Sequence, residues 1–154
     1  MTKAPAIHAE RDPDFLYVIH IDAKPEDVWA ALTDNKTERA WWGGTRQDSS
    51  FEPGSPIIYR RKGGVDVRGE ILESEPPRRL VYTFQVEGPG PQHDEGPSIV
   101  TYDVAANGKL TKLTVSHTNF PKNSAVLKGI SSGWPGILSG LKSALERGVV
   151  PAFF

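Results

Sequence analysis

Polar and hydrophobic residues alternate along much of the chain, with the period of two that is typical of half-buried strands. The first such run predicts a strand over Phe15–Ile21, which is rich in β-branched and aromatic residues. The later runs predict strands over Ser55–Lys62, Val65–Glu75, Arg79–Val86, Ser98–Ala105 and Lys109–Thr118. Asn107-Gly108 is a strong hairpin signal between the last two. With a weaker edge strand between Arg46 and Phe51, the pattern predicts an antiparallel meander of about seven strands.

Helical spacing predicts two short helices after the first strand. Apolar residues three and four positions apart indicate a helix that runs to about Thr33, with Asp22 as its cap and Pro25 in its first turn. A second short helix is expected near Asn35 to Trp42, because a double glycine follows it.

A long helix is predicted near the C-terminal end. Its apolar face is formed by Trp134, Ile137, Leu138, Leu141 and Leu145. Ser131 or Ser132 is the expected cap and Gly148 the expected stop. Gly136 and Gly140 lie inside this helix, where glycine is unfavourable, so they indicate either close approach of a neighbouring backbone or an exposed face.

This order of elements predicts an α+β domain, in which a curved antiparallel sheet packs around one long C-terminal helix. The domain is expected to span residues 15–148, between a flexible N-terminal segment (1–14) and a C-terminal tail (149–154). The interior between sheet and helix can stay open as a ligand cavity. The polar segment Glu87–Pro97, rich in Gly and Pro, is expected to be either a lid or disordered.

Composition and charge narrow the function classes. The 154 residues include 18 Lys or Arg and 19 Asp or Glu, so no positive field favours nucleic acid as a partner. The absence of cysteine excludes disulfides, thiolate zinc sites and cysteine nucleophiles. The four histidines show no metal-ligand spacing, so neither a metal nor another cofactor is expected. Without a membrane-spanning stretch or a secretory signal, we expect a cytoplasmic protein.

Five segments of the chain match one known superfamily in the same order. They are residues Ala23–Asp34, Trp41–Gly44, Phe51–Gly54, Glu75–Tyr82 and Gly133–Glu146. Together they cover about Phe15 to Gly148 and resemble the START-like helix-grip superfamily, also called SRPBCC, in the branch of homologues of the activator of a heat-shock chaperone ATPase. The resemblance implies a helix-grip fold, in which the sheet grips the C-terminal helix around a hydrophobic pocket.

Members of this superfamily bind lipids, hormones or polyketides, and a minority are enzymes. The resemblance therefore implies binding of a small, largely apolar ligand, lipid- or polyketide-like. One alternative is a START-like enzyme of the cyclase or dehydratase type, with His117 and a tyrosine as acid and base. Another is a protein-interaction module of the chaperone-regulator kind, which presents Trp41-Trp42 or the tail Val149–Phe154 to a partner. The eukaryotic activator looks like a two-domain protein, so a chaperone partner is not expected, and a homodimer stays open.

Candidate ligand-binding residues lie on the expected inner faces. His117 shares a strand face with Leu113 and Val115, so it should point inward, either as a structural histidine or as a ligand contact. Aromatic residues at such positions fit pocket lining and tight packing equally well. The predicted ligand-binding set is Trp41, Tyr59, Tyr82, Phe84, Tyr102, His117, Trp134, Leu138 and Leu141. Arg68 is expected to point outward, on the less apolar face of its strand.

No catalytic residue is predicted. Residues Gly129–Gly133 match the G-x-S-x-G pattern of a serine-hydrolase elbow, with Ser131 in the nucleophile position. In that fold an acid and a histidine follow the serine, and here neither Asp nor His follows Ser131. We therefore expect the serine to cap the final helix.

Overall fold

The alternating runs form strands near their predicted positions in the computed structural model, which describes residues 5–151. The strands are β1 (Phe15–Ile21), β2 (Arg46–Asp48), β3 (Pro56–Arg61), β4 (Gly64–Glu75), β5 (Arg79–Val86), β6 (Ser98–Asn107) and β7 (Leu110–Thr118). They form one antiparallel sheet in the order β1-β7-β6-β5-β4-β3-β2. The predicted α+β helix-grip fold is therefore confirmed.

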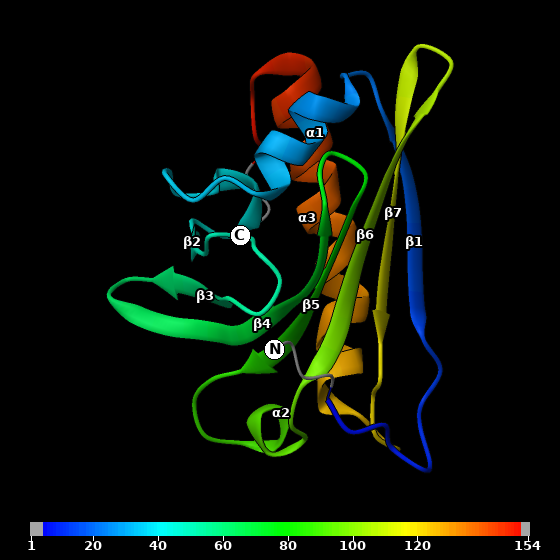
Figure 1. Cartoon of the computed structure of the whole chain (residues 1–154). Coiled ribbons are helices and arrows are strands. Elements are labelled where there is room, and N and C mark those ends of the chain that lie inside the picture. The colour runs from blue at the N-terminus through cyan, green and yellow to red at the C-terminus, as the bar shows by residue number, and fades with distance from the viewer. Residues whose placement is uncertain (1–4, 152–154) are drawn as a thin grey trace.

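The helices pack against this curved sheet. Figure 1 shows α3 (Ala125–Arg147) running along the sheet, with α1 (Pro25–Leu32) near its C-terminal end and α2 (Pro91–Asp94) near its N-terminal end. The 3-10 turn η1 (Ala40–Trp42) also contacts α3. Because strand side chains alternate between the two faces, every second residue of the central strands points to α3 and builds the core there. Arg68 points outward, as predicted, and pairs with Glu87 at 2.9 Å.

The two short helices differ in part from their prediction. The helix α1 forms where expected, but its N-cap is Lys24, and the amide of Asp22 instead donates to Glu146. The second helix is only the turn η1, because the Asp34 carboxylate accepts the backbone amides of Lys36 and Thr37 in a local turn that competes with helix.

The helix α3 begins earlier than predicted. Its N-cap is Ser124, whose hydroxyl accepts a hydrogen bond from a backbone amide in the first turn. Ser131 and Ser132 lie inside the helix and donate to carbonyls of the preceding turn, so the predicted cap was wrong. Proline is typical of a first turn, but Pro135 stands in the interior of this helix. The predicted stop at Gly148 is confirmed, with a left-handed φ of 70°.

Tertiary contacts explain the earlier helix start. The Glu95 carboxylate accepts hydrogen bonds from the Ser124 hydroxyl and from the amides of Ala125 and Val126. The Asp12 carboxylate accepts the Ser124 amide at 2.8 Å, which lowers the pKa of Asp12. Both carboxylates satisfy free amides at the positive end of the helix dipole. Segment Glu87–Pro97 is thus held against α3, which disagrees with disorder, one of its two predicted alternatives.

The two glycines inside α3 have different surroundings. A Cβ added at Gly140 would lie 3.3 Å from the Cα atom of Trp41, so this glycine permits close approach of the helix to η1. A Cβ added at Gly136 would meet no atom within 4 Å. Close approach of a neighbouring backbone is therefore confirmed for Gly140, whereas Gly136 is half-buried and has free space beside it.

Candidate ligand-binding site

The predicted ligand-binding residues gather in the interior between the sheet and α3. Trp41 comes from η1, Tyr59 from β3, Tyr82 and Phe84 from β5, Tyr102 from β6, His117 from β7, and Trp134, Leu138 and Leu141 from α3. None of the nine is more than 7% exposed. Strand register brings the tyrosines together, because Tyr82 pairs with Val100, two residues from Tyr102. Contact of these residues with a ligand stays a prediction.

A small pocket opens beside α3 at the edge of this interior. It has a volume of about 110 Å³ and is lined by Trp42, Phe84, Gly129, Ile130, Gly133, Trp134 and Ile137. Gly129 and Gly133 are one helical turn apart, and a Cβ added at Gly133 would meet no atom within 4 Å. The pocket is smaller than the roughly 300–1,000 Å³ of most ligand sites, because side chains fill the rest of the interior.

Aromatic rings provide most of that filling. The ring centroid of Trp42 lies 5.0 Å from those of Tyr59 and Trp134, both in edge-to-face contact. Tyr102 meets Trp134 in the same way at 6.1 Å. Such geometry is favourable for aromatic pairs beyond the burial of their area. Tight packing and pocket lining, which the sequence left open, are therefore both present, at different places in one cluster.

Three tyrosine hydroxyls form a chain at the centre of the cluster. The hydroxyl of Tyr82 contacts that of Tyr59 and lies 3.0 Å from that of Tyr102. Burial, together with the neighbouring hydroxyls, raises the pKa of Tyr82 well above its usual value, and burial also raises that of Tyr102. The hydroxyls of Tyr82 and Tyr102 therefore stay protonated near neutral pH. Tyr102 also interacts with Tyr59, so the three hydroxyls are partners of one another.

His117 belongs to a second chain of hydrogen bonds in the same interior. The indole N–H of Trp134 can only donate, so Nδ1 of His117 accepts it, at 3.1 Å. Burial lowers the pKa of His117 to about 3, so the ring is neutral at physiological pH and carries its proton on Nε2. That proton is donated to the hydroxyl of Ser98 at 2.7 Å, and Ser98 donates to the carbonyl of Phe84. Both ring nitrogens therefore have hydrogen-bond partners within the protein. This agrees with the first of the two alternatives predicted for His117, that of a structural histidine.

Arg39 is a member of the cluster that sequence reasoning missed. A backbone bridge between Arg39 and Thr45 closes the loop that contains η1 and turns the side chain inward, where it is 1% exposed. Its guanidinium lies 4.4 Å from the ring centroids of Trp42 and Tyr59. Nη2 donates to the Thr45 hydroxyl at 2.8 Å, whereas Nε and Nη1 have no partner among the described residues. Arginine is mostly exposed, so no sequence pattern indicated this position.

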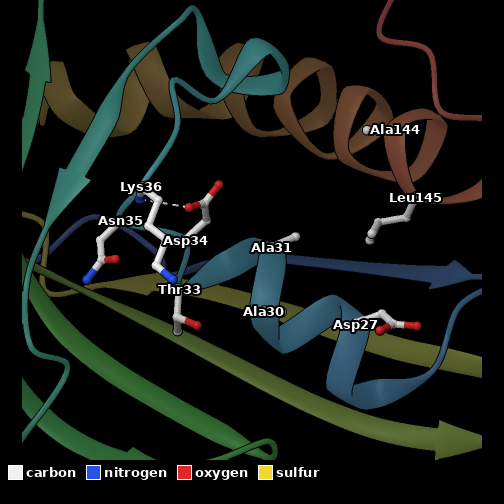
Figure 2. A pocket seen from close by; sticks show the side chains of 9 residues that line it. All are labelled: Asp27, Ala30, Ala31, Thr33, Asp34, Asn35, Lys36, Ala144 and Leu145. Atoms are coloured by element: carbon white, nitrogen blue, oxygen red, sulfur yellow. Dashed lines mark hydrogen bonds between the residues drawn. The ribbon is translucent and has the colours of Figure 1, made fainter.

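A larger hollow lies on the surface between α1 and the C-terminal half of α3, as Figure 2 shows. It is an open groove of about 690 Å³ lined by Asp27, Ala30, Ala31, Thr33, Asp34, Asn35, Lys36, Ala144 and Leu145. Partial burial raises the pKa of Asp34, but hydrogen bonds from Thr37 and from the Lys36 amide outweigh this effect and lower it overall. The carboxylate of Asp34 is thus used in a local turn, and the interior is the stronger candidate site.

Comparison with known proteins agrees with this geometry. The sequence profile described as "Activator of Hsp90 ATPase homolog 1-like protein" matches residues 22–146. The chain belongs to this family. Membership confirms the resemblance to the activator branch of the helix-grip superfamily. None of the curated proteins compared with the chain matches it significantly.

Several solved structures share the fold of this chain. Protein MLL2253 from Mesorhizobium loti is 25% identical over 90% of this chain and 100% of its own, with a TM-score of 0.77. CalU16 from Micromonospora echinospora, solved by NMR, is 25% identical over 90% of this chain and 68% of its own, with a TM-score of 0.71. The Aha1 dimer from Colwellia psychrerythraea is 22% identical over 89% and 98%, with a TM-score of 0.70.

The structure also shows where the residues of the predicted interaction surface lie. The pair Trp41-Trp42 does not form an exposed interaction surface, because Trp41 is 7% exposed and Trp42 packs on two other rings. Of the tail 149–154, residues 152–154 lie outside the described structure, and Val149 is 52% exposed. Among residues 5–151, no helix is long and apolar enough to cross a membrane, and no group of three His, Asp or Glu could hold a metal ion.

Proposed function

We propose that this protein binds a small, largely apolar molecule, lipid- or polyketide-like in character, between α3 and the sheet. The observation that carries the proposal is the pocket at Gly129 and Gly133, whose lining is almost entirely apolar. The pocket shares Phe84 and Trp134 with the aromatic interior. A ligand that enters there loses apolar surface to solvent, which is the main source of affinity in such sites.

Trp42 is the ring that a ligand would displace. It lines the pocket, and it is only partly buried, whereas Trp41 next to it is held tightly against α3 at Gly140. Gly43 and Gly44 follow with φ values of 58° and 76°, a left-handed backbone that glycine adopts without strain. Movement of this one ring would enlarge the pocket towards Tyr59, which the ring now contacts.

Binding is a better account of the interior than acid–base catalysis by His117. A general base needs a ring nitrogen within hydrogen-bond reach of its substrate. Both nitrogens of His117 are engaged with Trp134 and Ser98, and the low pKa of about 3 keeps the ring from acting as an acid near neutral pH. The cyclase or dehydratase alternative would therefore have to use other groups.

The test compares two glycines of the same helix. The neutral fluorescent probe N-phenyl-1-naphthylamine is titrated into the wild type, Gly133→Leu and Gly136→Leu. We expect saturable binding to the wild type, weakened by about tenfold or more in Gly133→Leu, because leucine fills the pocket mouth. Gly136→Leu is the matched control: both changes replace a helical glycine by a better helix former, but Gly136 does not line the pocket. Absence of saturable binding, or equal losses in both variants, would contradict the proposal.

A further inference from the structure

The interior contains more hydrogen-bond donors than acceptors. Arg39 carries three N–H groups on Nε and Nη1, none of which has a partner among the described residues. The three tyrosine hydroxyls beside it are hydrogen-bonded to one another. Within residues 5–151 no Asp or Glu side chain is buried, and the charge of the partly exposed Asp34 carboxylate acts on Arg39 without a hydrogen bond between the two.

The aromatic rings around Arg39 compensate its charge only in part. The guanidinium contacts the faces of Trp42 and Tyr59 at 4.4 Å and that of Trp41 at 5.3 Å, which are favourable cation–π distances. A ring face, however, provides no lone pair in the plane of the guanidinium, where its N–H groups point. Arginine keeps its charge in proteins, and a buried charge with unused donors is costly unless an acceptor reaches it.

Arg39 is next to the candidate pocket. The ring of Trp42 contacts the guanidinium on the one hand and lines the pocket on the other. On its inner side the charge of Arg39 acts on Tyr102, where it opposes the rise in pKa that burial causes. The guanidinium and the tyrosine hydroxyls therefore belong to one polar centre, which displacement of the Trp42 ring would connect to the pocket.

We propose that the ligand of this protein carries a carboxylate, and that Arg39 binds this group at the inner end of the pocket with help from the tyrosine hydroxyls. The inference rests on the proposed function and adds the chemical class of the ligand to it. The free N–H groups of Nε and of Nη1 lie on different edges of the guanidinium, and a carboxylate oxygen can accept a charge-assisted hydrogen bond from either. The apolar body of the same molecule then lies among Phe84, Trp134 and Ile137.

Two nearly isosteric probes test the inference. Isothermal titration measures the affinities of 2-naphthoate and of its neutral amide, 2-naphthamide, for the wild type, Arg39→Met and Arg46→Met. We expect the wild type to prefer the carboxylate by about tenfold or more, and Arg39→Met to lose that preference while it still binds N-phenyl-1-naphthylamine. Arg46→Met removes an equal charge from a side chain that is 51% exposed, and its preference should match that of the wild type.

A measurement on the wild type keeps the test decisive if Arg39→Met does not fold. Binding of 2-naphthoate should shift one arginine Nε–H resonance in the nitrogen–proton NMR spectrum, and 2-naphthamide should leave it in place. The inference is overturned if the wild type binds 2-naphthoate and 2-naphthamide equally well, or if Arg39→Met keeps the preference for the carboxylate. It is also overturned if the wild type binds N-phenyl-1-naphthylamine but neither 2-naphthoate nor 2-naphthamide. If none of the three probes binds the wild type, the proposed function fails as well.

Discussion

His117 and Arg39 are the two basic side chains that the described residues bury, and they differ in how their polar atoms are satisfied. Every polar atom of His117 has a hydrogen-bond partner, and burial has made the ring neutral. In Arg39, by contrast, only Nη2 has a hydrogen-bond partner among the described residues. The two residues are linked through two tryptophans. Trp134 donates a hydrogen bond to His117, and the ring of Trp42 contacts Arg39. The ring centroids of Trp42 and Trp134 are 5.0 Å apart.

The difference indicates two uses of buried polarity in one core. A satisfied network makes a core rigid and unique, whereas a buried group with unused donors is the exception in native proteins and calls for an explanation. We interpret the His117 chain as part of the fold and the Arg39 centre as reserved for a ligand. Stability measurements can test this comparison without any ligand.

The largest effect is expected when the satisfied network is broken. His117→Leu removes the acceptor of the buried Trp134 N–H and the donor to Ser98. The cost should be about 2–4 kcal/mol in urea-induced unfolding, because buried polar groups lose their partners. His93→Leu, at an exposed histidine, is the control and should change stability far less. A loss below about 1 kcal/mol for His117→Leu would show that the network is not structural.

Mild acid should also destabilise the protein through His117. Its pKa is about 3 when folded and near 6.5 when unfolded, so between these values the unfolded chain binds one more proton. Stability therefore falls as pH falls below about 6.5, by up to about 1.4 kcal/mol per pH unit. Urea unfolding at pH 7 and pH 5 measures this effect, because most carboxyl groups titrate below this pH range. His117→Gln should flatten the profile, and an unchanged slope in that variant would assign the effect to other groups.

The smallest effect is expected for Arg39→Met. The variant loses the cation–π contacts but also removes a buried charge whose Nε and Nη1 have no partner, and methionine fits the same apolar surroundings. We expect the free energy of unfolding to change by about 1 kcal/mol or less in either direction. A loss as large as that of His117→Leu would break the comparison, because Arg39 would then be a structural residue too.

The ends of the helices show where prediction from the sequence failed. Ser131 was predicted as a cap because serine at a helix boundary satisfies free backbone amides, but two distant carboxylates, those of Glu95 and Asp12, bind the amides where α3 begins. Asp22 is not the cap of α1, although its residue type favours caps, because the helix begins at Pro25 and its cap position is Lys24. At α3 the cap was misjudged because partners distant in sequence competed with local propensity.

The sequence by itself determined the strands and their meander order. It also determined that Tyr59, Tyr82, Tyr102, His117 and Trp134 point inward. Alternation and helical spacing are local patterns, and burial of one face of each element enforces them. Only the tertiary structure decided that Arg39 is buried with no partner for Nε and Nη1 among the described residues, and that Trp42 lies between it and a small pocket. Arginine in a loop has no period from which its direction can be derived. The position of Arg39 depends on the backbone bridge to Thr45 and on aromatic rings of β3, η1 and α3. These rings come into contact only when the sheet packs against the helix.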